Sequence, residues 1–246
     1  MRKFPDALRT LDRAIAAGMD SPITRVRSEA VVFAMSGDAA RFRAALAAAP
    51  ANLDVGGGET PWRILTALAA KDYDGAAAAL AASPLADFQG VDFTFYYPRA
   101  WYEALIARAR GDTNNAQRAF AATRSILEER LKIKPDDPRT LSVLAQVDAG
   151  LGRKALAFEE GQRAVDLMPV EKDAYDGPLI LEGLAQVCTW TNEKDRALEL
   201  LGRLVSMPGY VSYGYLLHDP IWDPLRSDSR FEQILASQAP KGANSP

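Results

Sequence analysis

The chain contains very little of the side-chain chemistry that most enzymes and metal sites use. Its 246 residues include one cysteine, Cys188, and one histidine, His218. A single cysteine excludes an intrachain disulfide framework and a zinc site built from cysteines. A single histidine removes most histidine-dependent catalysis and metal binding. We therefore expect no catalytic site, no metal site and no cofactor.

A surplus of basic charge and long apolar runs are absent as well. The chain has 29 basic and 32 acidic residues, which gives a formal net charge of −3. Without a basic surplus there is no phosphate-binding face, so nucleic acid is not expected as a partner. No apolar run approaches the ~20 residues needed to cross a bilayer, and the start lacks the apolar core of a signal peptide. The sequence predicts a cytoplasmic chain without membrane insertion.

What the chain does contain is alanine-rich helical periodicity, while runs of β-branched residues are scarce. This composition favours helix over strand. The clearest stretch is 138–170, where two apolar helical patterns are joined by a short turn at Gly152. The apolar and small residues on the two facing sides are Leu141, Leu144, Ala145, Ala157, Gly161 and Ala164.

The same pattern recurs along the chain. Packing alanines at positions 76, 116, 157 and 197 are separated by 40, 41 and 40 residues. Repeats of this length are typical of stacked helix pairs. We therefore predict an all-α fold, a right-handed solenoid of antiparallel helix pairs. Turns between helices are expected near Gly37, Lys71, Gly111, Gly152 and Asn192.

Three regions are expected. Residues 1–208 form the repeat array, 209–238 form C-terminal capping helices, and 239–246 form a disordered tail. The array starts in mid-repeat, because 4–18 matches the second helix of a later pair. We expect that it continues upstream in a longer protein; the alternative is an unusual N-terminal cap.

The capping segment has two Asp-Pro pairs, at 219–220 and 223–224, and each is expected to begin a helix. Ser229 and Glu232 have the spacing of a capping box for a last helix. The apolar residues that would cover the end of the array are Trp222, Leu225, Phe231, Ile234 and Leu235. In the competing interpretation, Trp222 and Arg226 form a docking patch for a partner.

Candidate binding residues follow from the geometry of such arrays, in which first helices line the concave face. The residues expected there are Trp101, Arg108, Ser142, Gln146, Glu182 and Gln186. A solvated helix face is an equally good interpretation of these polar residues. The aromatic group at 93–102 (Phe93, Phe95, Tyr96, Tyr97, Trp101 and Tyr102) could be a stacking surface, but we favour packing in the core.

The stretch 138–170 resembles a tetratricopeptide repeat, through Leu-x2-Leu-Ala at 141–145, Gly152, Ala-x3-Gly at 157–161 and Pro169. Leu141 and Gly161 replace the usual aromatic residues, and the spacing exceeds the usual ~34 residues. The C-terminal half, with its Asp-Pro-Ile-Trp-Asp-Pro-Leu-Arg ending at 219–226, resembles the repeat region of bacterial multidomain signalling proteins. In those proteins the array follows a serine/threonine kinase, a nucleotide cyclase or a winged-helix regulator.

Two hypotheses about function remain. The resemblance implies a non-catalytic protein–protein interaction or scaffolding module, part of a larger signalling protein with an upstream domain. Its partner would be a protein or peptide. The alternative is a helical sensor that binds a small molecule in an aromatic pocket near Trp101 and Tyr102.

Overall fold

The computed structural model describes residues 4–50, 59–89, 94–207, 209 and 211–240. Helices make up most of this part, so the prediction of a helical fold is confirmed. The only strands among the described residues are β1 (Asp87–Gln89) and β2 (Tyr96–Pro98), which pair antiparallel. This hairpin was not expected, since the connection after the fifth helix carries too short an alternating pattern to predict a strand.

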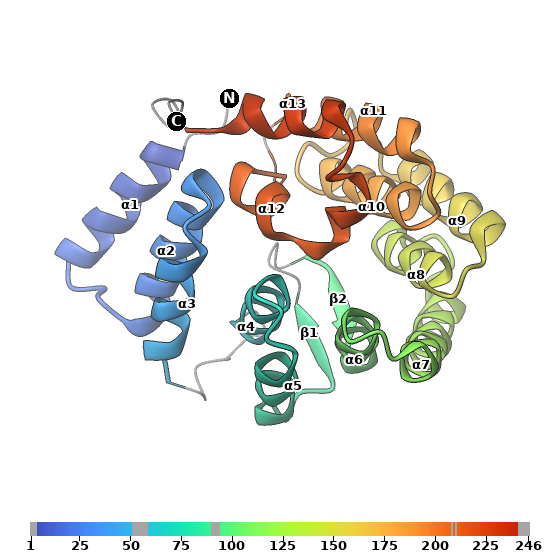
Figure 1. Ribbon diagram of the computed structural model, residues 1–246, viewed down its shortest axis with the longest axis horizontal. Coiled ribbons are helices and arrows are strands. Elements are labelled where there is room, and N and C mark those ends of the chain that lie inside the picture. Colours follow the sequence, from blue (N-terminus) through green and yellow to red (C-terminus); the bar gives the residue numbers. More distant parts are fainter. Residues whose placement is uncertain (1–3, 51–58, 90–93, 208, 210, 241–246) are drawn as a thin grey trace.

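The helices follow one another around an arc (Figure 1). Consecutive helices from α1 to α11 pack against each other in chain order. The α-helices are α1 (Phe4–Ala16), α2 (Pro22–Ser36), α3 (Ala39–Ala48), α4 (Glu59–Ala69), α5 (Tyr73–Ala82), α6 (Arg99–Ala109), α7 (Thr113–Ile133), α8 (Pro138–Gly150), α9 (Lys154–Leu167), α10 (Asp176–Trp190), α11 (Lys194–Leu204), α12 (Tyr213–His218) and α13 (Ser229–Gln238), with a 3-10 helix, η1 (Pro220–Leu225), before the last.

The five predicted turns are all present. Each contains a residue in the left-handed conformation, with φ of 74°, 59°, 76°, 75° and 62° at positions 37, 71, 111, 152 and 192. Glycine and asparagine suit this conformation best, and lysine at position 71 is the exception. At the first three turns the next residue is an aspartate that caps the following helix. Asp38, Asp72 and Asp112 each accept a hydrogen bond from a backbone N–H three residues on, at 2.8–3.1 Å.

Two helix starts near the C-terminus differ from expectation. Pro224 lies inside η1 and begins no new helix, whereas Pro220 does follow a capping aspartate, Asp219. The last helix is capped by Asp228 and not by Ser229, because the Asp228 carboxylate accepts from the backbone N–H of Arg230 at 2.9 Å. Aspartate one position earlier competes successfully with serine for the orphan N–H groups.

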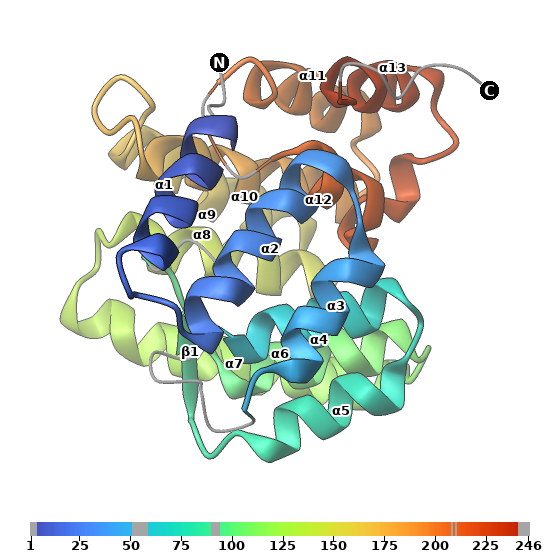
Figure 2. The same cartoon turned by 90° about the vertical axis from the view of Figure 1, so that its left-hand side faces the viewer.

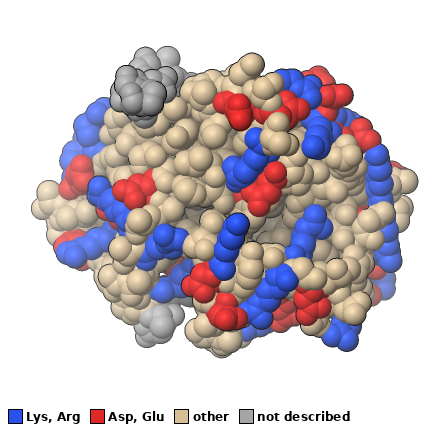
Figure 3. Space-filling model, in the orientation of Figure 1, with Lys and Arg blue, Asp and Glu red and all other residues tan. Residues whose placement is uncertain are grey.

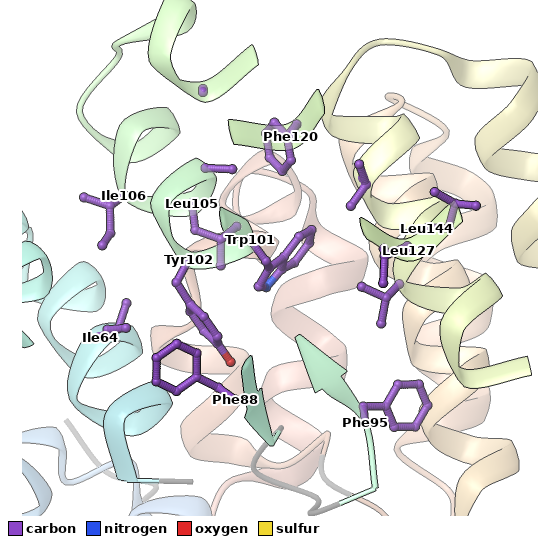
Figure 4. Close-up of a cluster of buried hydrophobic side chains, with 14 of the residues drawn as sticks. Ile64, Phe88, Phe95, Trp101, Tyr102, Leu105, Ile106, Phe120, Leu127 and Leu144 are labelled. Carbon is purple, nitrogen blue, oxygen red and sulfur yellow. The ribbon is translucent and has the colours of Figure 1, made fainter. Parts of the chain in front are cut away.

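The aromatic group belongs largely to the core. Phe95, Trp101 and Tyr102 are buried, and the Tyr102 ring meets Phe88 of β1 edge to face at 5.4 Å. The ring centroids of Trp101 and Phe120 of α7 are 5.9 Å apart; both residues are labelled in the close-up (Figure 4). The core interpretation is confirmed for these residues. Tyr96 is instead 49% exposed, and Phe93 lies outside the described residues.

Small residues let α8, α9 and α10 approach closely. Ala145, Ala157 and Ala185 are completely buried. A Cβ added to Gly161 of α9 would lie 3.0 Å from Leu184 Cδ1 of α10. Small residues therefore line the closest approach of these helices, and Leu184 of α10 fills the space beside Gly161.

The C-terminal segment folds back across the inner side of the arc. Helix α12 packs on α2, and η1 packs on α10 (Figures 1 and 2). His218 Nε2 donates a hydrogen bond to the carbonyl oxygen of Gly37, 2.8 Å away and 181 positions earlier in the chain. A Cβ on Gly214 would collide with the carbonyl oxygen of Phe33, so only glycine fits there. This segment thereby joins the two ends of the arc.

The same segment covers the end of the helix series. Trp222, Leu225 and Phe231 are at most 2% exposed and cluster with buried leucines of α10 and α11. Helix α13 lies beside α11 in both ribbon views (Figures 1 and 2). Burial of Trp222 leaves its ring unavailable to a partner, which argues against a docking patch built on that residue.

Candidate functional site

Five of the six candidate residues border two hollows on the inner side of the arc. Trp101, Gln146, Glu182 and Gln186 line the first, which we call the aromatic hollow; its volume is about 100 Å³. Arg108 lines the second, the Arg108 hollow, of about 780 Å³. In the space-filling view this face is hollowed near its middle, with both basic and acidic side chains around it (Figure 3).

Ser142 is the exception. It is only 1% exposed, because α8 and α10 meet closely where α10 carries Gly183. A Cβ at Gly183 would collide with Ser142 Oγ and lie 3.0 Å from Gln146 Nε2. Ser142 therefore belongs to a helix–helix contact, and Gln146, at 4% exposed, reaches the aromatic hollow only in part.

The aromatic hollow is too small for most organic ligands, whose sites span about 300–1,000 Å³. The aromatic side chains that line it pack against one another: the ring centroid of Tyr97 lies 5.7 Å from that of Trp101 and 6.2 Å from that of Tyr102. Tyr215, Asp219 and Ile221 of the C-terminal segment close the opposite side. The pocket expected near Trp101 and Tyr102 is thus largely occupied by the protein's own side chains.

The Arg108 hollow is larger and combines apolar walls with charge. Helices α4 and α6 contribute Leu65, Leu68 and Leu105. The end of α10 contributes Trp190, and the C-terminal segment contributes a wall that includes Pro220 and Ile221. Its basic side chains are Lys71, Arg108 and Arg226, and its acidic side chains are Asp219 and Asp223.

Arg108 is held in place by aromatic stacking. Its guanidinium carbon lies 4.5 Å from the centroid of the Trp190 ring. Trp190 is itself fixed by Trp101 and Phe120, each with ring centroids 6.0 Å away. Arg108 as a whole is exposed, and loss of water around its guanidinium lowers its pKa, but arginine stays protonated at any physiological pH. The hollow therefore contains a cation in a defined position.

The C-terminal wall has its charges mostly satisfied internally. Arg226 pairs with Asp223 at 2.6 Å and donates to the carbonyl oxygens of Leu216 and Asp219 at 3.1 and 3.0 Å. The Asp219 carboxylate accepts from the backbone N–H of Ile221 at 2.9 Å. Loss of water raises the pKa of Asp219 to about 6 despite that hydrogen bond and nearby Arg226. Asp219 lines both hollows.

A second group of charges is buried away from the hollows, between α7, α8 and α9. Asp148 is completely buried and accepts from Arg124 Nε at 2.9 Å. Burial and the neighbouring Asp148 raise the pKa of Glu160 to about 8. The sequence pattern gave no sign that these two carboxyl groups lie together.

Glu160 predicts a specific dependence of stability on pH. Its folded-state pKa is raised from 4.5 to about 8, so between these values the folded protein holds a proton that the unfolded chain has lost. This contribution is complete below pH 4.5 and is lost as pH rises through about 8. Melting temperatures of Glu160→Gln should therefore fall less between pH 5 and 8 than those of the wild type. The exposed neighbour gives the control, Glu159→Gln; a Glu160→Gln profile parallel to the wild type would refute the assignment.

Cys188 and His218, whose residue types are often used in catalysis, both make contacts that hold the fold together. Cys188 is buried in the α10–α11 cluster, where loss of water raises the pKa of the thiol to about 11 and leaves it a poor nucleophile. His218 is bonded to the Gly37 carbonyl oxygen. Cys188 is thus closed off from solvent, whereas His218 also lines the Arg108 hollow.

None of the helices in the described ranges is both long and apolar enough to cross a membrane. Comparison with models of known families, with curated proteins and with solved structures finds no match to the chain. The inner face of the arc and its two hollows are the features of the chain that bear on function.

Proposed function

We propose that the chain is a non-catalytic binding module whose inner face takes a protein or peptide partner. The helix pairs would form a right-handed, tetratricopeptide-like solenoid, which presents first helices on its concave side. One observation supports this proposal above the others: the inner face already accepts a peptide segment, residues 213–225 of the same chain. Helix α12 of that segment packs on α2 and η1 packs on α10, and His218 donates a hydrogen bond to the Gly37 carbonyl oxygen at 2.8 Å.

The resemblance of the C-terminal half to the repeat region of bacterial signalling proteins extends the proposal. In such a protein the array would be an accessory part that brings a partner to an output domain, in the cytoplasm. Reading the gene upstream of the Met1 codon tests this part of the proposal. An open reading frame that encodes a kinase, cyclase or winged-helix domain is expected.

Peptide selection tests binding at the inner face directly. Peptides would be selected from a displayed random library against the wild-type chain, and their affinities measured for two matched variants. Gln186→Arg changes the lining of the aromatic hollow, whereas Gln162→Arg makes the same change on the exposed face of α9. We expect a loss of at least about tenfold for Gln186→Arg, as for a central interface residue, and none for Gln162→Arg. Peptides that bind both variants like the wild type would contradict the proposal.

A small-molecule sensor is the second candidate, and the volume of the Arg108 hollow favours it. At about 780 Å³, this hollow falls within the usual range for ligand sites, about 300–1,000 Å³. A thermal-shift screen against metabolites tests the sensor, which predicts that a small ligand raises the melting temperature. A screen in which no metabolite raises the melting temperature would contradict it.

A further inference from the structure

The two free cations of the Arg108 hollow are its most informative feature. Among the described residues, no carboxylate forms an ion pair with Arg108 or with Lys71. Arg110, which follows the end of the same helix, is by contrast paired with Asp74 at 2.6 Å. Both side chains are exposed to solvent, and unpaired cations that share a cavity attract an anion from solution.

The acidic residues of the hollow do not serve as those counter-charges. Asp223 is paired with Arg226 at 2.6 Å. Asp219 accepts from the Ile221 N–H at 2.9 Å and caps η1. Both carboxylates are engaged by the C-terminal segment itself, so they leave Arg108 and Lys71 available.

The stacking of Arg108 on Trp190 prepares the guanidinium for a planar anion. A guanidinium that lies over an aromatic face keeps its edge N–H donors free, and those donors match the two oxygens of a carboxylate. The 4.5 Å separation from the Trp190 centroid restrains the group before any ligand arrives. Less conformational entropy is then lost on binding.

The apolar walls of the Arg108 hollow indicate the chemistry of the rest of the ligand. Leu65, Leu68 and Leu105 form an apolar side, and Pro220 and Ile221 face the same space from the C-terminal segment. A small inorganic anion would leave these apolar surfaces exposed to water, whereas a ligand with an apolar part would bury them. We infer that the Arg108 hollow binds a small organic carboxylate with an apolar body, with Arg108 as the main anchor and Lys71 as a second positive charge. This inference rests on the second proposed function, the small-molecule sensor, and is independent of peptide binding at the inner face.

Calorimetric titration with three probes tests the inference. The probes are 4-phenylbutyrate, its neutral analogue 4-phenylbutan-1-ol, and inorganic phosphate. We expect saturable one-to-one binding of 4-phenylbutyrate, at least about tenfold weaker binding of the alcohol, as for loss of a charge-assisted hydrogen bond, and no binding of phosphate. Absence of phenylbutyrate binding, equal binding of the alcohol, or equal binding of phosphate would each overturn the assigned ligand class.

Matched variants locate the site. Arg108→Gln should weaken phenylbutyrate binding by at least about tenfold, while Arg110→Gln, two residues along the helix, should leave it unchanged. Lys71→Asn removes the second charge and suits the left-handed conformation at φ 59°, so it should fold and weaken binding by a smaller factor. Circular dichroism and thermal melts establish that each variant folds. Binding that is unchanged in both Arg108→Gln and Lys71→Asn would place the probe elsewhere and overturn the inference.

Discussion

Deletion of residues 219–246 is expected to lower the melting temperature strongly and to make the chain aggregate. The deletion removes Trp222, Leu225 and Phe231, which are at most 2% exposed and cover the leucines of α10 and α11. Burial of each such side chain contributes about 1.5–3 kcal/mol, partly offset by the entropy of ordering the segment. The uncovered cluster would be an apolar patch of the kind that drives association. Thermal melts and light scattering measure both effects.

A shorter deletion provides the control. Removing only residues 241–246, which lie outside the described part, takes away no contact described above and should change neither property. The Cys188 thiol gives an independent readout, because it belongs to the same cluster and is completely buried. Its reaction with a thiol reagent should accelerate only in the longer deletion. If that deletion stays monomeric and equally stable, residues 219–238 are no cap, and a docking role would replace it.

Ala157→Trp is expected to destabilise the protein severely. Ala157 is completely buried where α8, α9 and α10 meet, in a cluster with Ala145, Ala149 and Val187. Overpacking a close-packed core costs about 1–3 kcal/mol and occasionally more, and an indole in a methyl-sized space belongs at the upper end. Thermal and urea unfolding would measure the loss.

The same substitution two residues earlier controls for the indole itself. Ala155 is exposed on α9, so Ala155→Trp should change the free energy of unfolding by no more than about 0.5 kcal/mol. If Ala157→Trp melts within a degree of the wild type, the packing of these helices differs from that described.

The features that could be predicted from sequence are those that local chemistry determines. A left-handed residue followed by aspartate ends one helix and caps the next, as at Gly37–Asp38 and Gly111–Asp112. Such signals act within a few residues, so helix boundaries followed from them. Buried alanines recurring about every forty residues likewise mark the packing faces.

The packing of the C-terminal segment against the N-terminal helices could not be predicted from these local signals. It depends on a contact between His218 and Gly37 and on the fit of Gly214 against Phe33. No periodicity within either segment encodes the meeting of residues so far apart. The β1–β2 hairpin was missed for a related reason, since each strand has only three residues.

Helical periodicity placed the candidate site residues on one face of their helices, but it does not say how deeply each side chain is buried. Ser142 was placed on that face, yet Gly183 of α10 lets the helices approach until Ser142 is buried. Trp190 was missed although a signal existed, because it continues the four-residue spacing of Glu182 and Gln186 on the same helix. Lys71 lines the Arg108 hollow because of how the neighbouring helices pack, and no signal in the sequence indicated this position.

Nuclear magnetic resonance titration of the labelled chain with a selected peptide tests the central claim, that the inner face of the arc is the binding surface. The side-chain amide of Gln186 and the indole N–H of Trp190 report on the inner face, and the amide of Gln162 reports on the exposed face of α9. Shifts of the Gln186 and Trp190 signals, with the Gln162 signal unchanged, are the predicted result. Shifts of Gln162 and other exposed residues of α9, with Gln186 and Trp190 unchanged, would contradict it.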